Sequence, residues 1–240
     1  MILLPFYVDD IIKTALNEDI NYIDSTADLL IPEDSISSAY FVAKASGVVA
    51  GLEVALRVFT ILDPDMKIDC RFKDGDEVKN GDIIAEFTGH TRLMLKAERT
   101  ALNLLQHMSG IASYTNRCVK LVEGTNASIA DTRKTLPGLR ALQKYAVTAG
   151  GGRNHRYNLT DAAMLKDNHI DAYGGITNLL LENKKTAEPG IYASFAAGDN
   201  EAWQTKLEET RQEMLRINHG FESLGLDVKV ADEFVNERME

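Results

Sequence analysis

The hydrophobic period of this 240-residue sequence changes twice along the chain, and each change restricts the folds open to it. Over residues 39–88, short apolar runs alternate with turn-forming tetrapeptides, a pattern typical of β-strands. Over residues 95–112, apolar side chains recur every three or four positions, which predicts one long helix with Gly110 near its end. After Ser128, short apolar runs alternate with helical stretches, which is typical of βα units in a parallel sheet or barrel.

The individual elements follow from the same patterns. Helices are expected over Tyr7–Asn17 and Leu136–Ala149, and turns at Lys73–Asp76 and Lys79–Asp82. The predicted strands are Tyr40–Ala43, Gly47–Gly51, Ile83–Phe87, Ser128–Ala130 and Ala163–Leu165. The first part of the chain is therefore expected to form a small α/β sandwich.

The formal net charge of −10 argues against a nucleic-acid binder or a polybasic membrane anchor, so any anion site must be local. The two cysteines fit neither a metal-ligand spacing nor a disulfide framework. No segment approaches the roughly 18 apolar residues of a membrane-spanning helix, and the N-terminus lacks an export signal. We therefore expect a cytoplasmic location.

Residues 131–169 form a basic island, which contains seven lysines and arginines but only three aspartates. Arg140 and Lys144, four residues apart on a predicted helix, are interpreted as a solvated helix face with salt bridges. The other cations follow predicted strands or the glycine run 150–152, which can be a flexible helix exit or a backbone approach to phosphate. Since ligands bind at such segment ends in parallel α/β folds, the island predicts a substrate with several negative charges.

Four segments of the sequence form one ordered set: Ala97–Asn103, Asp131–Thr135 with Pro137–Arg140, Gly151–Arg156 and Leu165–His169. In order and spacing they resemble the quinolinate phosphoribosyltransferases, or nicotinate-nucleotide pyrophosphorylases (carboxylating). The resemblance runs from the first predicted helix to about Asn178.

The resemblance implies phosphoribosyl transfer from phosphoribosyl pyrophosphate to quinolinate, followed by decarboxylation to nicotinate mononucleotide, with Mg²⁺. It assigns catalytic roles to Lys134 and Lys166, and places Arg99 in the active site of the partner subunit of a homodimer. The residues it assigns to substrate binding are Arg99, Thr132, Arg133, Lys134, His155, Arg156 and Lys166. Asn168 and His169 are interpreted as structural.

The family implies acidic residues after later strands, for ribose and Mg²⁺, and a glycine-rich phosphate loop. Beyond Asn178 the acids Glu182, Glu188 and Asp199 do not follow a convincing apolar strand, and no such loop is found. We therefore expect an N-terminal α/β sandwich (1–95), an incomplete α/β barrel made of its first half (96–181), and an acidic, helical appendage (182–240) that packs over the open barrel without catalytic groups.

The origin of the non-matching tail has three explanations that remain open: a truncated or frame-shifted product, a fusion, and a diverged pseudoenzyme. The alternative function is anion binding without turnover, and nucleic-acid binding is disfavoured.

Overall fold

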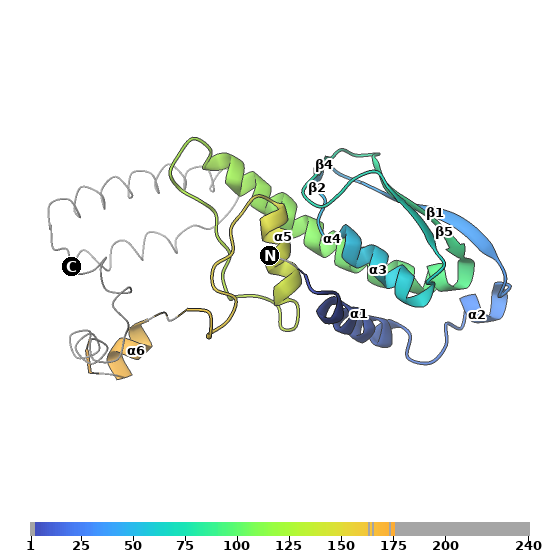
Figure 1. Cartoon of the computed structure of the whole chain (residues 1–240), viewed down its shortest axis with the longest axis horizontal. Helices are drawn as coiled ribbons and strands as arrows, with labels where there is room; N and C mark the ends of the chain where they lie inside the picture. Colours follow the sequence, from blue (N-terminus) through green and yellow to red (C-terminus); the bar gives the residue numbers. More distant parts are fainter. Residues whose placement is uncertain (1–2, 163, 165, 173, 176–240) are drawn as a thin grey trace. The chain divides into compact units, whose positions relative to one another are not determined.

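The computed structural model describes residues 3–162, 164, 166–172 and 174–175. The chain divides into two units after Tyr157. Among the described residues, no helix combines the length and apolar character that crossing a bilayer requires. The helices are α1 (Pro5–Asp19), α2 (Ala27–Leu30), α3 (Leu52–Leu62), α4 (Thr91–Leu121), α5 (Arg140–Ala149) and α6 (Asp167–Ala172); the strands are β1 (Ile36–Val42), β2 (Gly47–Val48), β3 (Lys67–Cys70), β4 (Glu77–Val78) and β5 (Ile83–His90) (Figure 1).

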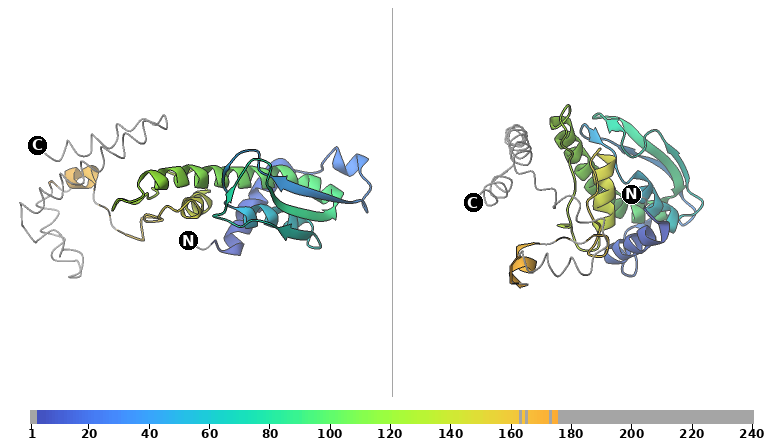
Figure 2. Two further views of the ribbon diagram at one scale, coloured as in Figure 1. Left: turned by 90° about the horizontal axis from the view of Figure 1, so that it is seen from above. Right: turned by 60° about the vertical axis from the view of Figure 1, so that its left-hand side comes forward.

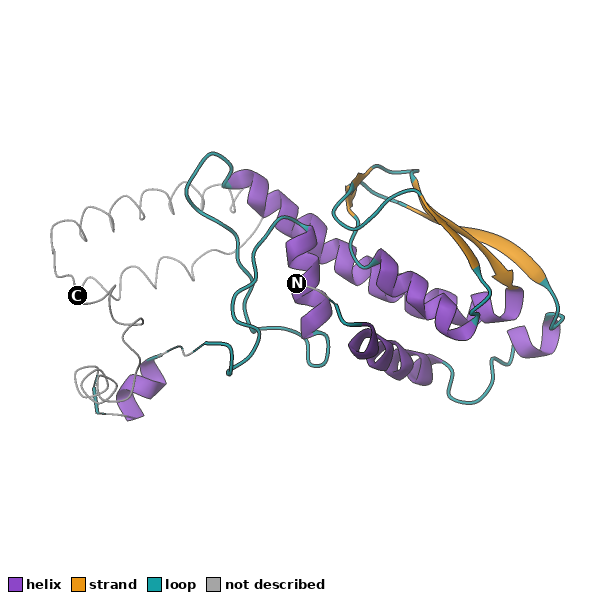
Figure 3. Cartoon of the chain, viewed as in Figure 1, coloured by secondary structure: helices purple, strands orange, loops and turns teal. Residues whose placement is uncertain are grey.

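The first unit is an α/β structure in which an antiparallel sheet of order β1-β5-β3 packs on α3 and α4 (Figure 3). Three phenylalanines from different elements meet between the sheet and α3. The rings of Phe41 (β1) and Phe87 (β5) lie 5.1 Å apart, and that of Phe59 (α3) lies 4.7 Å from Phe87. The predicted N-terminal α/β module is confirmed in class, and aromatic burial across the sheet and helix stabilises it.

Several predicted elements differ from the structure. The strand predicted over Gly47–Gly51 ends at Val48, and α3 follows. This helix was not predicted because its exposed polar face is narrow and consists of Glu53 and Arg57. Gly51 begins this helix with a φ of +82°, and the Asp74 carboxylate accepts the backbone N–H groups of Gly51 and Leu52. The helix predicted to end near Gly110 continues to Leu121.

The second half of the first unit is less regular than predicted. The strand predicted over Ser128–Ala130 is reduced, in the described residues, to one parallel bridge between Ala130 and Arg153. Helix α5 begins only at Arg140, four residues later than predicted. The strand at Ala163–Leu165 falls partly, and the appendage at 182–240 wholly, outside the described residues. The incomplete barrel and the domain boundaries therefore stay predictions, and α4 runs unbroken through the boundary at 95/96.

Helix α5 lies beside α4 (Figure 2), and the glycine run after α5 allows the two to pack closely. Gly151 has a φ of +89°, while the N–H groups of Gly151 and Gly152 donate to the carbonyls of Thr148 and Val147, which forms a Schellman cap. A Cβ atom on Gly150 would lie 2.3 Å from the carbonyl oxygen of Ala112 in α4. The described structure therefore accounts for these glycines by helix capping and helix contact.

We predict that Gly150→Ala lowers the free energy of unfolding by about 1–3 kcal/mol, because the added methyl group overlaps α4. Gly110→Ala is the matched control. Gly110 lies within α4, and a Cβ atom added there meets nothing within 4 Å. That control should gain up to about 1 kcal/mol from helix propensity. Urea denaturation measures the stability of both variants. Equal midpoints would contradict the close contact between Gly150 and α4.

A buried carboxylate ties the end of α3 to the start of α4. Asp63 is 2% exposed, and its Oδ2 accepts the His90 backbone N–H (2.8 Å) and lies 3.1 Å from His90 Nδ1. Burial opposes ionisation, but the hydrogen bonds and charge of His90 outweigh it and hold the pKa of Asp63 below its ordinary value. The carboxylate therefore contributes stability above its unfolded-state pKa, which is lost as the pH falls through the lower folded-state value.

We predict that Asp63→Asn destabilises the fold at pH 5 and that its deficit relative to the parent shrinks as the pH falls toward about 3. The parent carboxyl group becomes protonated over this range and loses its advantage over the amide. Urea midpoints measured across the range provide the check, with the exposed Asp69→Asn as control. A deficit that is constant with pH would show that the Asp63 charge contributes nothing.

Candidate anion site

The candidate site is built on the parallel bridge between Ala130 and Arg153. The Asp131 N–H donates to the Arg153 carbonyl (3.0 Å), and the Arg153 N–H donates to the Ile129 carbonyl (2.8 Å). Because the two segments run in the same direction, the residues that follow them emerge at the same end. This bridge brings together four of the predicted site residues: Thr132 and Arg133 after one segment, and His155 and Arg156 after the other.

A buried ion pair between α5 and the first segment lies beside this end of the bridge. Lys144, on α5, and Asp131 have side chains only 1% and 7% exposed, and Lys144 Nζ pairs with Asp131 Oδ1. Lys144 Nζ also donates to the backbone carbonyl of His155 at 3.0 Å. The interpretation of Lys144 as part of a solvated helix face is therefore wrong.

The same carboxylate fixes the second segment. Asp131 Oδ1 accepts the His155 backbone N–H at 2.8 Å. The hydrogen-bonding groups around Asn154 assign its amide the orientation in which the NH2 group donates to Asp131 Oδ2 at 2.6 Å and to the Lys144 carbonyl at 2.9 Å. Asp131, Lys144 and Asn154 thus form one network, which we call the Asp131 network, that joins α5 to both segments of the bridge.

The orientation of the His155 ring follows from its neighbour. The Arg156 backbone N–H donates to His155 Nδ1 at 2.7 Å, so Nδ1 acts as the acceptor. In the neutral ring the proton then lies on Nε2, on the far side from the backbone. The exposed His155 therefore presents a hydrogen-bond donor at its tip.

Arg140 is also not part of a solvated helix face, and this interpretation is wrong as well. It is half-buried, and its guanidinium donates to Thr135 Oγ1 (3.0 Å) and to the carbonyls of Tyr157 (3.2 Å) and Arg133 (3.5 Å). It lies over the Tyr157 ring, 6.0 Å from the ring centroid. The planar guanidinium group of Arg140 therefore links the loop after the first segment to the end of the second segment by hydrogen bonds.

Arg133 itself has an unsatisfied polar group. Its Nε atom is buried and has no hydrogen-bond partner within the described structure. An unpaired buried N–H is costly, and an arginine Nε readily pairs with a carboxylate or phosphate oxygen. Arg133 is therefore suited to an anionic ligand.

The remaining predicted residues have different placements. Thr132 and Lys134 are exposed, and Thr132 Oγ1 accepts the Lys134 backbone N–H at 3.0 Å. Lys166 belongs to the second unit, where its backbone N–H donates to His169 Nδ1 at 3.1 Å beside α6. This contact is compatible with a structural role for His169, and the interpretation of Asn168 and His169 as structural stays a prediction.

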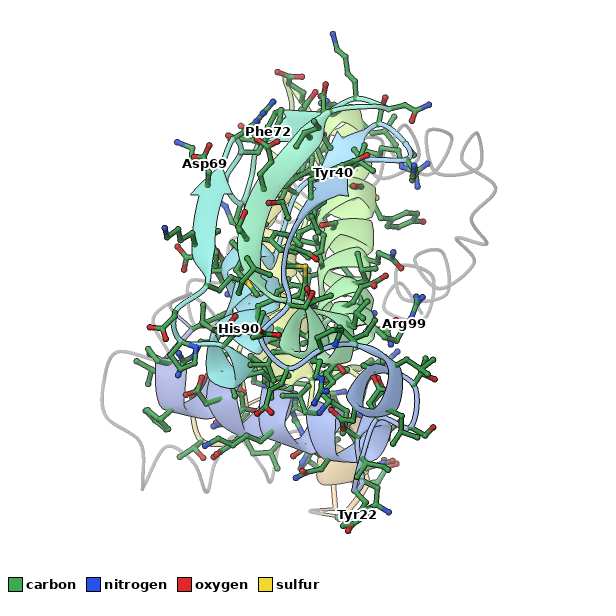
Figure 4. The ribbon with its side chains drawn as sticks, turned by 90° about the vertical axis from the view of Figure 1, so that its right-hand side faces the viewer. Tyr22, Tyr40, Asp69, Phe72, His90 and Arg99 are labelled. Carbon is green, nitrogen blue, oxygen red and sulfur yellow. The ribbon has the colours of Figure 1, made fainter. Side chains whose placement is uncertain are left out.

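Arg99 projects outward from α4 and is exposed (Figure 4). It precedes Ala112, which contacts Gly150, by 13 residues, or about 20 Å of helix. The structure therefore does not bring Arg99 to the bridge within the first unit. The described residues also contain no group of three or more histidine, cysteine, aspartate or glutamate side chains able to hold a metal.

The Asp131 network was not predicted from the sequence, although one signal was present. Lys144 follows the buried Ala141 by three residues, which places it on the buried face of the helix. A charge on a buried face needs a partner, and the basic island contains only three aspartates.

Known proteins resemble this chain over most of its length. Residues 24–109 match the family model of the quinolinate phosphoribosyl transferase N-terminal domain, and residues 111–195 match that of the C-terminal domain. The chain is 46% identical over 177 residues to the nicotinate-nucleotide pyrophosphorylase [carboxylating] of Mycobacterium leprae, covering 71% of this chain and 61% of that protein. It is 41% identical over 214 residues to the chloroplastic enzyme of Arabidopsis thaliana, covering 89% and 60%.

Solved structures of the same family superimpose on this chain. NadC from Streptococcus pyogenes superimposes with a TM-score of 0.73 at 43% identity, covering 77% of this chain and 66% of that one. The nicotinate-nucleotide pyrophosphorylase of Ehrlichia chaffeensis gives a TM-score of 0.73 at 34% identity, covering 79% and 68%. The chain spans 48–61% of the length of the curated relatives it matches, and residues 196–240 lie outside both family models. Family models, relatives and structures agree that this chain belongs to the quinolinate phosphoribosyltransferase family.

Proposed function

We propose that this chain binds quinolinate and phosphoribosyl pyrophosphate and catalyses phosphoribosyl transfer with decarboxylation, giving nicotinate mononucleotide, CO₂ and pyrophosphate. The observation that carries the proposal is the arrangement at the Ala130–Arg153 bridge. Arg133, His155 and Arg156 emerge at one end of it, and Arg133 Nε is buried without an acceptor among the described residues. A pyridine dicarboxylate supplies the acceptors that such a site requires.

The chemistry needs positioning and charge more than a protein nucleophile. The quinolinate nitrogen forms a bond to C1 of the ribose as the bond from C1 to pyrophosphate breaks, through a state with oxocarbenium character. The carbon–carboxylate bond then breaks, the pyridinium ring accepts its electron pair, and the ring carbon takes up a proton as CO₂ leaves. Lys134 and Lys166 are proposed to serve this site catalytically, and for Lys166 the support is the family motif alone.

Mg²⁺ is proposed to arrive with the diphosphate of the donor. The described residues offer no three-residue metal site, so no step is assigned to the ion. A cytoplasmic location also remains a prediction, and curated relatives include proteins named chloroplastic and mitochondrial.

The first test is quinolinate binding by alanine variants of the full chain. Arg133→Ala and Arg156→Ala should each weaken binding by about 10-fold to 150-fold, because each leaves a carboxylate unpaired in a partly dry site. Arg153→Ala is the matched control, since this exposed arginine lies on the same segment outside the predicted site. Isothermal titration calorimetry provides the measurement, and parent-like binding by Arg156→Ala would refute its assignment.

The alternative is an anion-binding protein without turnover, for which the cations at the Ala130–Arg153 bridge would serve equally well. Incubation with quinolinate, phosphoribosyl pyrophosphate and Mg²⁺ separates the two functions. Release of CO₂ and nicotinate mononucleotide supports the enzyme, while binding without either product supports the alternative.

We further propose a homodimer in which Arg99 completes the site of the partner subunit. The position of Arg99, about 20 Å of helix before the Ala112–Gly150 contact, supports action between subunits. Arg99→Ala and Arg133→Ala should each be inactive alone, whereas mixing them should restore activity to about a quarter of the parental sites through mixed dimers. No recovery in a mixture shown to exchange subunits would exclude a shared site.

A further inference from the structure

The part of the site without an assigned role is the Asp131 network beneath it. Lys144 lies on α5, Asp131 follows the first segment of the bridge, and Asn154 belongs to the second. The Asp131 carboxylate receives one side-chain cation, one backbone N–H and one side-chain amide. Both charged side chains are more than nine-tenths buried.

Two contacts of the network end on the backbone of His155. Its N–H donates to Asp131 Oδ1 at 2.8 Å, and its carbonyl accepts from Lys144 Nζ at 3.0 Å. The next N–H, that of Arg156, donates to His155 Nδ1 at 2.7 Å. The network thus holds the peptide groups on both sides of His155, and the second of these groups sets the tautomer of the ring.

We propose that the Lys144–Asp131 pair is the positioning element of the anion site: it fixes the backbone at His155 so that the ring presents Nε2–H, and Arg156 its guanidinium, to the ligand. This inference rests on the proposed function for the identity of the ligand. Neither Lys144 nor Asp131 touches the ligand, so both act through His155 and Arg156.

A contribution to folding stability does not by itself explain why the Lys144–Asp131 pair is present. Removing two charges from water costs several kcal/mol per ion, and a neutral replacement of similar size often leaves a protein equally stable or more stable. Removing one partner leaves an uncompensated charge and is strongly destabilising. Single and double substitutions therefore separate stability from positioning.

The experiment compares Lys144→Met, Asp131→Asn and the double variant in the full chain, with quinolinate as the probe. Each single variant should weaken quinolinate binding by about tenfold or more. The double variant should regain most of the parental urea midpoint while its quinolinate binding stays weakened, because the His155 carbonyl has still lost its donor. Binding that recovers together with stability in the double variant would overturn the inference.

Asp63→Asn is the control, because it removes a buried, hydrogen-bonded carboxylate near His90 rather than near the bridge. It should lower stability and leave quinolinate affinity unchanged at pH 7. If Asp63→Asn weakens binding as much as Lys144→Met, general destabilisation explains the effect and the positioning role is wrong.

A measurement without ligand separates this inference from the proposed function. Imidazole ¹⁵N signals, assigned with a His155→Gln variant, should show the Nε2–H tautomer in the parent and a mixture of tautomers in Lys144→Met. Amide exchange at His155 should also accelerate in that variant. If the parent fails to bind quinolinate, the proposed function fails, while unchanged tautomer and exchange in Lys144→Met would refute the positioning role.

Discussion

The candidate site depends on one buried pair of opposite charges. Lys144 and Asp131 are removed from water, and such a pair is tolerated only where further hydrogen bonds satisfy its remaining donors and acceptors. Here those bonds come from Asn154 and from both backbone groups of His155. The arrangement that satisfies the pair is therefore the same arrangement that aligns the two segments carrying the cations.

The pair in turn requires a fixed α5, and α4 provides the surface for it. Gly150 lets the end of α5 approach the carbonyl of Ala112, where any side chain would clash. The burial of Tyr145 on α5, together with its hydrogen bond to Asp74, raises the pKa of its hydroxyl. Since Asp74 also caps α3, α5 is anchored both to the long helix and to the N-terminal module.

Local signals predicted only part of this structure. The turns at Lys73–Asp76 and Lys79–Asp82 were predictable because each contains a glycine, which adopts a positive φ angle, followed by an aspartate that accepts the N–H of the lysine three residues earlier. The existence of α4 was predictable from its period. In contrast, α3 has only a narrow exposed polar face, made by Glu53 and Arg57, and the Ala130–Arg153 bridge depends on a partner 23 residues away. Pairing at that distance leaves no trace in either segment alone.

The motifs themselves mix two kinds of residue. Between Asp131 and Lys134, the first side chain is buried in the network, Thr132 and Lys134 are exposed, and Arg133 is half-buried with a free Nε. In the next segment Asn154 bonds to the network, and the His155 ring points its tip outward. Charge alone cannot separate these roles, because the Lys144 cation is bonded within the interior while the buried Arg133 Nε has no acceptor among the described residues. The hydrogen-bond partners separate them: a buried charge with internal acceptors holds the surrounding backbone in place, whereas a buried donor that lacks one in the described structure is suited to a ligand.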